Sequence, residues 1–250
     1  MKRHLDWPDL LNARDLGGYR CADGAETRWR AVIRADNLNK LGPAGTRAMV
    51  DYGVRTVLDL RDPRELEKFP NPLAARPPDG VTFVNVPLIS DAEWAAIKEA
   101  GRALEGYVQM AKLSHANLSA AVGAVADAPA GGVVIHCHAG KERTGVLSAL
   151  LLALCDVPDE MIADDWTASD LYLQPLYAEW LSTEEDPALR AKRADGFRTE
   201  PQHILDVLDH LRSRGGVVPY LIAGGTSLDQ LARVRQRLRS GPTSARSNGA

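Results

Sequence analysis

The sequence predicts an α/β fold in which a mainly parallel central sheet is flanked by helices. Between residues 29 and 155, short runs of β-branched and apolar residues alternate with helical patterns, and this alternation is typical of parallel strands joined by helices. One run, Val133-Val134-Ile135, has no polar residue, as expected for a central strand that is covered on both faces. Beyond Pro158 the pattern is wholly helical, which predicts a helical carboxyl-terminal extension.

The elements of the sheet region follow in order along the chain. Apolar runs bounded by turn residues predict strands at residues 29–33, 55–60, 81–87 and 133–135. Helices are expected at residues 46–52, after Pro63 at a first helical position, and at residues 144–155. Residues 91–128 predict two helices broken near Leu113-Ser114, with Asp91 as the N-cap and an apolar face of Trp94, Ile97, Leu104, Tyr107 and Val108.

The carboxyl-terminal region is predicted from helical spacing as well. Apolar residues recur at near-helical intervals through residues 159–182, and a charged stretch with little apolar content follows at residues 183–200. Two further amphipathic helices are expected at residues 202–212 and 227–238. Residues 1–240 are expected to form a single domain, and the tail at 241–250, which lacks a core-forming pattern, is expected to be disordered.

The composition argues against several classes of protein. The 250 residues hold 30 Lys and Arg against 33 Asp and Glu, and this balance predicts no nucleic-acid partner. The amino terminus lacks the apolar run of a secretory signal, and the most apolar stretch, residues 146–154, is far shorter than the roughly 20 residues that a bilayer span needs. We therefore expect a cytoplasmic protein without stable membrane insertion. Export without a standard signal is the alternative, and the oligomeric state stays open.

The cysteines and histidines indicate no disulfide framework and no metal site. The three cysteines, Cys21, Cys137 and Cys155, include no CxxC pair, which fits a reducing compartment. Cys21 and Cys155 are expected to be structural, with a protective disulfide to Cys137 under oxidation as the alternative. His4, His115, His203 and His210 have no metal-ligand spacing, and neither a metal nor another cofactor is predicted.

The most informative segment is residues 133–145, which read VVIHCHAGKERTG. An apolar strand leads to Cys137, Arg143 follows six positions later, and a helix begins there. The five residues between them can wrap into a semicircle whose backbone N–H groups point inward, completed by the helix N-terminus. Gly140 and Gly145 allow the tight turn and a close approach of the backbone. This arrangement suits the oxygens of a phosphate dianion.

The same segment supplies a nucleophile and a clamp for the phosphate. The helix end, Lys141 and Arg143 favour the thiolate of Cys137, and Arg143 offers two parallel N–H donors to phosphoryl oxygens. We predict transfer of a phosphoryl group to Cys137 followed by hydrolysis of the thiophosphate, with Thr144 donating to the departing sulfur. The predicted phosphate-binding residues are His138, Ala139, Gly140, Lys141, Thr144 and Gly145. For His138 the alternative is a side chain that faces solvent.

These residues resemble the signature of the protein tyrosine phosphatase superfamily, HCxxxxxR[ST], and within it the bacterial group of the mycobacterial phosphatase B type, with its HCxxGKxRTG loop. Three further segments are similar to that group: Asn12-Ala13-Arg14-Asp15-Leu16-Gly17-Gly18-Tyr19, Asp59-Leu60-Arg61 with Glu65 following, and the helical region from Val218-Pro219-Tyr220-Leu221 to Leu238. The resemblance implies a cysteine phosphatase fold and a cysteinyl-phosphate mechanism. It also implies phosphorylated proteins or phosphoinositides as substrates, with phosphotyrosine, phosphoserine and phosphothreonine accepted. Lys141 is similar to the loop lysine of lipid phosphatases and would neutralise a second phosphate.

The general acid is the part of the mechanism that the sequence leaves open. The related loops have Asp before the arginine, whereas this chain has Glu142, our first candidate. Asp59 is the next candidate, followed by Asp62, Asp164 and Asp165. Trp7-Pro8-Asp9 spells an acid-loop motif but stands too close to the terminus to serve as one.

Other features have both a functional and a structural interpretation. The first is the amino-terminal segment with Arg14, Asp15 and Gly17-Gly18, which either braces the phosphate loop or forms a tight turn. The second is the pair Asp59 and Arg61, which either belongs to the site at the end of a strand or forms a plain ion pair. Arg34-Ala35-Asp36 either reaches the site or begins a loop. Residues 164–200 either form a lid over the pocket or an ordinary helical edge.

Two rival functions remain to be weighed against an active phosphatase. A phosphate-binding pseudoenzyme would not need both Cys137 and Arg143, and a sulfurtransferase would not need the arginine six positions on or the RTG that it begins. The sequence therefore predicts an active enzyme.

Overall fold

A computed structural model of the chain describes residues 1–90, 92–93, 95 and 105–241. The expected N-cap Asp91, the apolar positions Trp94, Ile97 and Leu104, and the tail at 242–250 lie outside the described residues.

The centre of the protein is a five-stranded sheet with the order β1-β2-β5-β3-β4. Only β1 is antiparallel to its neighbour, so the mainly parallel sheet that the sequence predicts is confirmed. The strands are β1 (Arg14–Asp15), β2 (Val32–Ala35), β3 (Val54–Asp59), β4 (Thr82–Asn85) and β5 (Gly132–His136).

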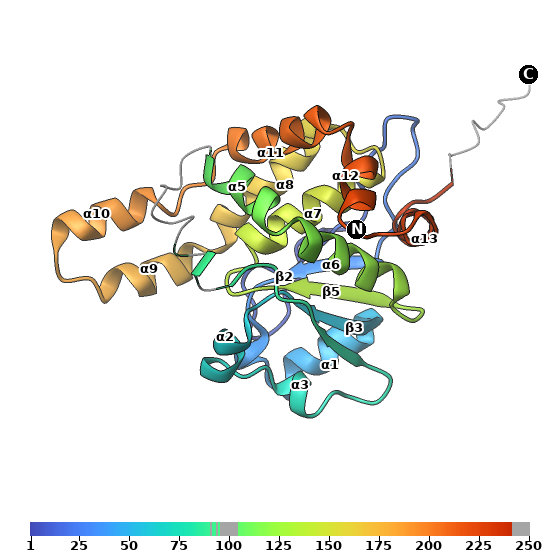
Figure 1. Ribbon diagram of the computed structural model, residues 1–250. Coiled ribbons are helices and arrows are strands. Elements are labelled where there is room, and N and C mark those ends of the chain that lie inside the picture. The colour runs from blue at the N-terminus through green and yellow to red at the C-terminus, as the bar shows by residue number, and fades with distance from the viewer. Residues whose placement is uncertain (91, 94, 96–104, 242–250) are drawn as a thin grey trace, which may run out of the picture.

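Alternate side chains of the central strands enter two separate cores. Ile33, Val57 and Val134 lie in register across β2, β5 and β3 and belong to one cluster. Their neighbours Val32 and Leu58, with Val133 and Ile135 of β5, belong to the larger cluster on the opposite face. In Figure 1 the helices α1, α2 and α3 lie below the sheet, and α5 to α8 and α11 to α13 lie above it.

The helices of the described residues carry the following bounds: η1 (Leu38–Lys40), α1 (Pro43–Tyr52), α2 (Pro63–Lys68), α3 (Pro72–Ala75), α5 (Glu105–Leu113), α6 (His115–Asp127), α7 (Glu142–Leu154), α8 (Asp159–Tyr172), α9 (Gln174–Ser182), α10 (Pro187–Asp195), α11 (Pro201–Ser213), α12 (Val217–Ala223) and α13 (Leu228–Leu238). The predicted break at Ser114 and the helical start after Asp62 are confirmed. No helix in the described ranges has the length and apolarity that a bilayer span requires.

Several predicted boundaries were wrong for local reasons. The strand expected at 29–33 begins at Val32, because Arg30 has a φ of 64° and turns the chain. Pro72 opens the short helix α3, with Asn71 as its cap, between the strands expected at 55–60 and 81–87. The charged stretch contains α10, in agreement with the helical pattern predicted beyond Pro158, and Asp186 caps this helix by accepting hydrogen bonds from two backbone amides.

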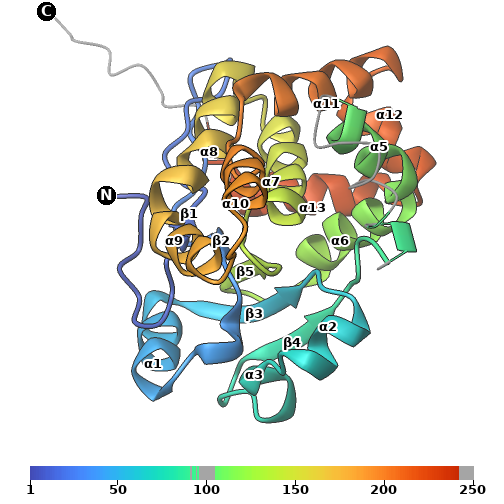
Figure 2. The same cartoon turned by 90° about the vertical axis from the view of Figure 1, so that its left-hand side faces the viewer.

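Helices α9 and α10 extend away from the rest of the protein, as Figures 1 and 2 show. A small third cluster joins them to the sheet region: Leu173 and Tyr177 pack with Ala139 of the β5–α7 loop, against partly buried Trp180 and Phe197. The extension is thus attached directly to the segment that the sequence marks as functional.

Candidate active site

The β5–α7 loop, residues 137–141, lies at the carboxyl edge of the parallel strands. Strand β5 ends at His136 and α7 begins at Glu142, so the loop enters the first turn of a 13-residue helix. The first N–H groups of such a helix have no partner within it and carry the positive end of its dipole. Cys137, at the base of the loop, is 1% exposed.

The carbonyl groups of this loop are held from outside by other segments of the chain. The backbone amide of Asn37 donates to His138 O over 3.0 Å. The side-chain amide of Asn12 donates to Ala139 O over 3.0 Å and to Gly140 O over 3.2 Å. Because these carbonyls point outward, the adjoining N–H groups are free to face an anion inside the loop.

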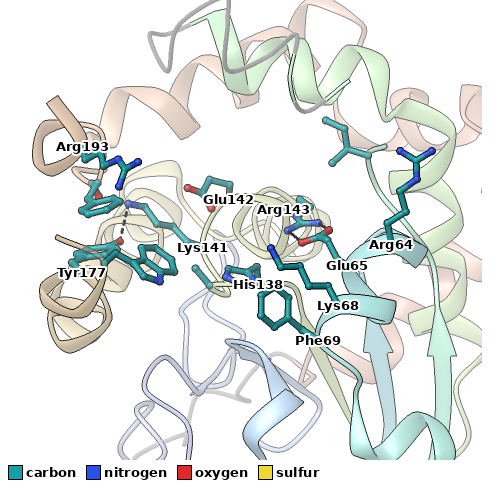
Figure 3. Close-up of a pocket in the computed structure, with 14 residues that line it drawn as sticks. Arg64, Glu65, Lys68, Phe69, His138, Lys141, Glu142, Arg143, Tyr177 and Arg193 are labelled. Atoms are coloured by element: carbon teal, nitrogen blue, oxygen red, sulfur yellow. Dashed lines mark hydrogen bonds and ion pairs between the residues drawn. The ribbon is translucent and has the colours of Figure 1, made fainter. Parts of the chain in front are cut away.

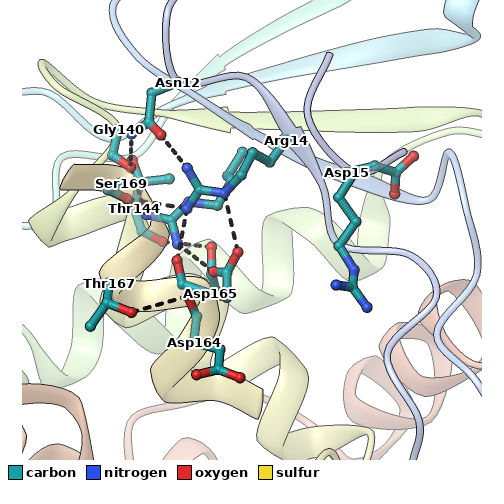
Figure 4. Close-up of polar contacts among 12 residues, drawn as sticks. Asn12, Arg14, Asp15, Gly140, Thr144, Asp164, Asp165, Thr167 and Ser169 are labelled. Atoms are coloured by element: carbon teal, nitrogen blue, oxygen red, sulfur yellow. Dashed lines mark hydrogen bonds and ion pairs between the residues drawn. The ribbon is translucent and has the colours of Figure 1, made fainter. Parts of the chain in front are cut away.

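Arg34 makes a further contact with the loop and joins it to a buried polar network. Figure 4 shows this network around Arg14 and Asp165. Its guanidinium donates to Gly140 O over 2.6 Å and pairs with Asp165 on α8. Arg14 lies on the other side of Asp165, with 3.3 Å between Nε and Oδ1. Burial alone would raise the pKa of Asp165, but the two guanidinium groups outweigh it and lower that pKa. Asp165 is therefore a fixed counter-charge that supports the loop.

Two glycines of the motif have different structural roles. Gly140 has a φ of 63°, and a Cβ there would lie 2.3 Å from Ala35 O. A Cβ on Gly145 would lie 2.6 Å from the Trp166 ring, so this glycine allows α7 to pack closely against α8. Gly140 thus shapes the loop, whereas Gly145 serves helix packing.

Arg143 is held by Glu65 of α2. Its two terminal nitrogens each donate to one carboxylate oxygen of Glu65, one of them over 2.9 Å. Burial alone would lower the pKa of Arg143, but its hydrogen bonds to Glu65 and the nearby Cys137 raise that pKa. The same pair lowers the pKa of Glu65 in spite of burial. Glu65 also accepts a hydrogen bond from Asp62 N in the capping box of α2. The position of its carboxylate is therefore set by α2 as well as by Arg143.

Asp59 lies beneath the loop and is fully buried. Arg61 donates to both of its oxygens, and Nε2 of His136 lies 3.1 Å from Oδ2. Burial alone would raise the pKa of Asp59, but His136 and Arg61 outweigh it and lower that pKa well below its usual range. This placement counts against the expectation that Asp59 donates a proton to the leaving group, and it supports a role in holding the loop.

A cavity of about 630 Å³ opens over the loop (Figure 3). One wall comes from α2 and Phe69, the opposite wall from the α9–α10 extension, and the loop lies between them. The lining carries more cations than carboxylates: Arg64, Lys68, Lys141, Arg143 and Arg193 against Glu65 and Glu142. A cavity with this charge balance favours anionic ligands.

Lys141 points toward the extension and is already engaged there. Its Nζ donates to Tyr177 OH over 2.9 Å and to Phe197 O, and it lies 3.0 Å from Asp170 Oδ1. In the structure the charge of Lys141 is paired with Asp170. A second phosphate would have to compete with this carboxylate for the Lys141 ammonium group. Lys141 connects the loop to α8, to α9 and to the chain after α10.

The remaining predicted residues occupy distinct places. Glu142 and His138 line the cavity, and His138 lies between Phe69 and Trp180, with ring centroids 5.5 Å and 5.9 Å away. Burial lowers the pKa of His138. The Oγ1 of Thr144 is buried and does not form the expected hydrogen bond to the Cys137 sulfur in this structure.

The sequence over residues 5–240 matches the model of the tyrosine phosphatase family. The chain belongs to the tyrosine phosphatase family. A tyrosine-protein phosphatase of Nostoc commune is similar to it, with 28% identity over 219 residues that make up 83% of this chain and 74% of that protein. This tyrosine phosphatase family member is therefore an enzyme that acts on phosphorylated substrates.

Several predicted residues of this phosphatase lie away from the cavity. Asp15 closes a turn by accepting from the amides of Gly17 and Arg30, and Asp62 caps α2. Asp164 is exposed on α8. No group of three or more His, Cys, Asp or Glu in the described part of the chain could hold a metal ion, and all three cysteines are free and buried.

Sequence reasoning missed the residues that act from a distance along the chain. Glu65 was noted only as part of a motif, and its pairing with Arg143 spans 78 positions. Asn12 and Tyr177 were not singled out either, although they hold Gly140 and Lys141. Their signal in the sequence was weak: Asn12 begins the amino-terminal motif, and Tyr177 is one of several aromatic residues at helical spacing.

Proposed function

We propose that this phosphatase hydrolyses phosphate monoesters through a cysteinyl-phosphate intermediate. The observation that carries the proposal is the β5–α7 loop, in which outward carbonyls are bound, Arg143 is fixed by Glu65, and Cys137 lies at the base. A phosphate bound there meets backbone N–H groups, the helix dipole and a guanidinium together.

In the first step the Cys137 thiolate attacks phosphorus, the S–P bond forms, and the P–O bond to the leaving group breaks. Glu142, which lines the cavity next to Arg143, donates a proton to the leaving oxygen. In the second step the Glu142 carboxylate accepts a proton from water, the resulting hydroxide attacks phosphorus, and the S–P bond breaks. Free phosphate leaves, and the buried Thr144 hydroxyl donates to the thiolate.

The range of substrates that we propose includes phosphotyrosine, phosphoserine, phosphothreonine and phosphoinositides, as in the mycobacterial phosphatase B group that the loop resembles. A cavity of about 630 Å³ is wide enough for a flat ring, and Phe69, His138 and Trp180 offer it aromatic faces. Arg64, Lys68 and Arg193 surround the entrance with positive charge for additional phosphates.

The proposed enzyme is tested first by hydrolysis of para-nitrophenyl phosphate under reducing conditions at acidic to neutral pH. We expect turnover by wild type and its loss in Cys137→Ser. Cys155→Ser is the matched control, because Cys155 is a buried thiol at the far end of α7. Phosphate binding by a folded wild type without turnover, on this ester and on phosphopeptides and phosphoinositides, would replace the enzyme with a phosphate-binding pseudoenzyme.

Residues 164–200 are proposed as a lid of a single domain that spans residues 1–240. The lid is supported by the three contacts of Lys141 with Asp170, Tyr177 and Phe197. Tyr177→Phe removes one of them and should speed hydrogen exchange across residues 174–197. Exchange in this region that is slow in wild type and unaffected by bound phosphate would exclude gating.

A further inference from the structure

A second hollow, of about 310 Å³, lies between α5, α6, α11 and α12. It shares no lining residue with the catalytic cavity. Its side chains include four basic groups from three helices, namely Lys112, His115, His210 and Arg214, and no carboxylate among the described residues lines it. Two of the four, Lys112 and Arg214, carry a fixed positive charge in a chain with a net charge of −3.

The cations of the hollow have no carboxylate partners in the described part of the chain. Lys112 and Arg214 are both exposed and form no ion pair there. Arg212, two positions before Arg214 on α11, gives the contrast: it pairs with Asp159 and Asp209. The charge of the hollow is therefore left for a ligand or for solvent.

The floor of the hollow is rigid. Nε2 of His115 lies 2.6 Å from Tyr220 O, and the two rings contact each other at a tilt of 34°, with centroids 4.2 Å apart. The Tyr220 hydroxyl in turn donates to Ala111 O over 2.5 Å. Because Nε2 donates to that carbonyl, protonation of His115 adds a second donor at Nδ1.

The helix that begins at His115 offers backbone N–H groups at its start, next to the carboxyl end of α5 at Leu113. Ser114, the N-cap of the 13-residue α6, makes no side-chain capping bond, so the first N–H groups of α6 keep their capacity to donate. Burial lowers the pKa of His210, and Lys112, Arg214 and His115 lower it further, because each positive neighbour opposes another charge. A bound anion would offset the positive charges of these neighbours and so raise the pKa of His210.

We propose that this hollow is a second anion-binding site, separate from the catalytic cavity, which takes a phosphoryl group or a similar dianion. The four basic side chains supply the donors, and Tyr220 with Pro219 forms the apolar floor and rim. The site is independent of the catalytic loop, so its test does not depend on turnover.

The probe is inorganic phosphate, added to the full chain and followed by NMR of amide and imidazole signals at constant ionic strength. We expect shifts at His115, His210 and Tyr220 in addition to those of the catalytic loop. Phosphate should also raise the pKa of His210, because binding and protonation favour each other. Sulfate, which stays a dianion across neutral pH, should bind more tightly as pH falls and His210 gains a proton. Lys112, His115, Arg214 and Tyr220 are the other groups that line the hollow with it.

Lys112→Gln with Arg214→Gln should weaken this binding roughly tenfold, because each of the two exposed cations contributes about 0.7 kcal/mol and 1.4 kcal/mol corresponds to tenfold. Arg212→Gln is the matched control, and all these variants should keep wild-type turnover of para-nitrophenyl phosphate. Phosphate shifts confined to the catalytic loop, or equal binding by the double variant and the control, would overturn the proposal. If the double variant fails to fold, Lys112→Gln alone serves, with a several-fold loss expected.

The source of the phosphoryl group is decided with phosphatidylcholine vesicles that contain or lack phosphatidylinositol 4-phosphate. Sedimentation that needs this lipid, Lys112 and Arg214 assigns the site to a lipid headgroup. Phosphate binding without such sedimentation assigns it to a soluble phosphorylated molecule.

Discussion

The guanidinium of Arg34 donates a 2.6 Å hydrogen bond to the carbonyl of Gly140, so a fully buried cation holds the β5–α7 loop from outside. Arg34 also pairs with Asp165, and one side chain therefore joins β2, the loop and α8. Since the guanidinium has several donors in a fixed plane, it can satisfy both partners without moving.

Arg34→Lys should keep a positive charge beside Asp165 but lose the hydrogen bond to the carbonyl of Gly140. We expect inorganic phosphate, as a competitive inhibitor, to bind about tenfold more weakly, since about 1–2 kcal/mol of loop stabilisation is lost. The inhibition constant is measured together with the melting temperature. Arg20→Lys, on the exposed surface, is the control and should change neither. Wild-type inhibition by phosphate in Arg34→Lys would show that this contact does not position the loop.

Gly140→Ala should abolish phosphate binding, because the new Cβ would lie 2.3 Å from Ala35 O at a φ of 63°. Gly24→Ala is the control: its φ is 83°, but nothing lies within 4 Å of an added Cβ. The control should cost about 1 kcal/mol of unfolding free energy and leave activity intact. Isothermal titration with phosphate and urea denaturation separate the two effects. Equal losses in both variants would mean that backbone strain alone explains the Gly140 result.

Glu65→Gln should make stability less dependent on pH. Burial alone would raise the pKa of Glu65, but Arg143 outweighs it and the pKa is lowered. A carboxylate of this kind stabilises the fold above its unfolded pKa, near 4.3, and the contribution is lost as pH falls through the lower folded value. At neutral pH we expect the variant to lose about 1–3 kcal/mol of unfolding free energy. Urea denaturation from pH 7 to pH 3 should show this difference shrinking.

The matched control for Glu65 is Glu67→Gln, an exposed neighbour on the same helix. Its stability should run parallel to that of wild type at every pH. A constant gap between Glu65→Gln and wild type down to pH 3 would contradict the assignment of the effect to ionisation of this carboxylate.

Glu142→Gln should lower kcat by about 10²–10⁴-fold for phenyl phosphate, whose leaving group needs a proton. The loss for para-nitrophenyl phosphate should be smaller, because its leaving group is a weaker base. Glu142→Asp, which keeps the carboxyl group, should retain most of the activity. Equal losses with both substrates would point to a role of Glu142 other than proton donation.

Most of the sheet could be predicted from the sequence because its signals are local. Apolar β-branched runs, Pro63 and the capping residue Asp62 act over a few positions, and β3, β5 and α2 lie where these signals put them. The start of β2 could not, because a non-glycine residue with positive φ leaves little trace in a periodic pattern.

In the candidate site, too, the local features could be predicted from the sequence and the long-range contacts could not. The order strand, Cys137, Arg143 and helix is contained in one segment, and it could be predicted with its geometry. The groups that fix it could not, because Glu65 and Asn12 reach the loop only through the tertiary fold. Asp59 illustrates the limit: its position at a strand end predicts a site residue, but only the structure reveals that Arg61 and His136 enclose it.

The contacts that hold the loop also determine when the site can form during synthesis. Asn12 meets Gly140 across 128 positions, and Arg34 meets Asp165 across 131. A chain emerges at about 5–20 residues per second, so the amino-terminal segment waits for many seconds before either partner exists. A nascent chain that has released the β5–α7 loop but not α8 therefore carries the full signature and no formed phosphate site. The enzyme acquires its activity late, once α8 has closed over the buried arginines.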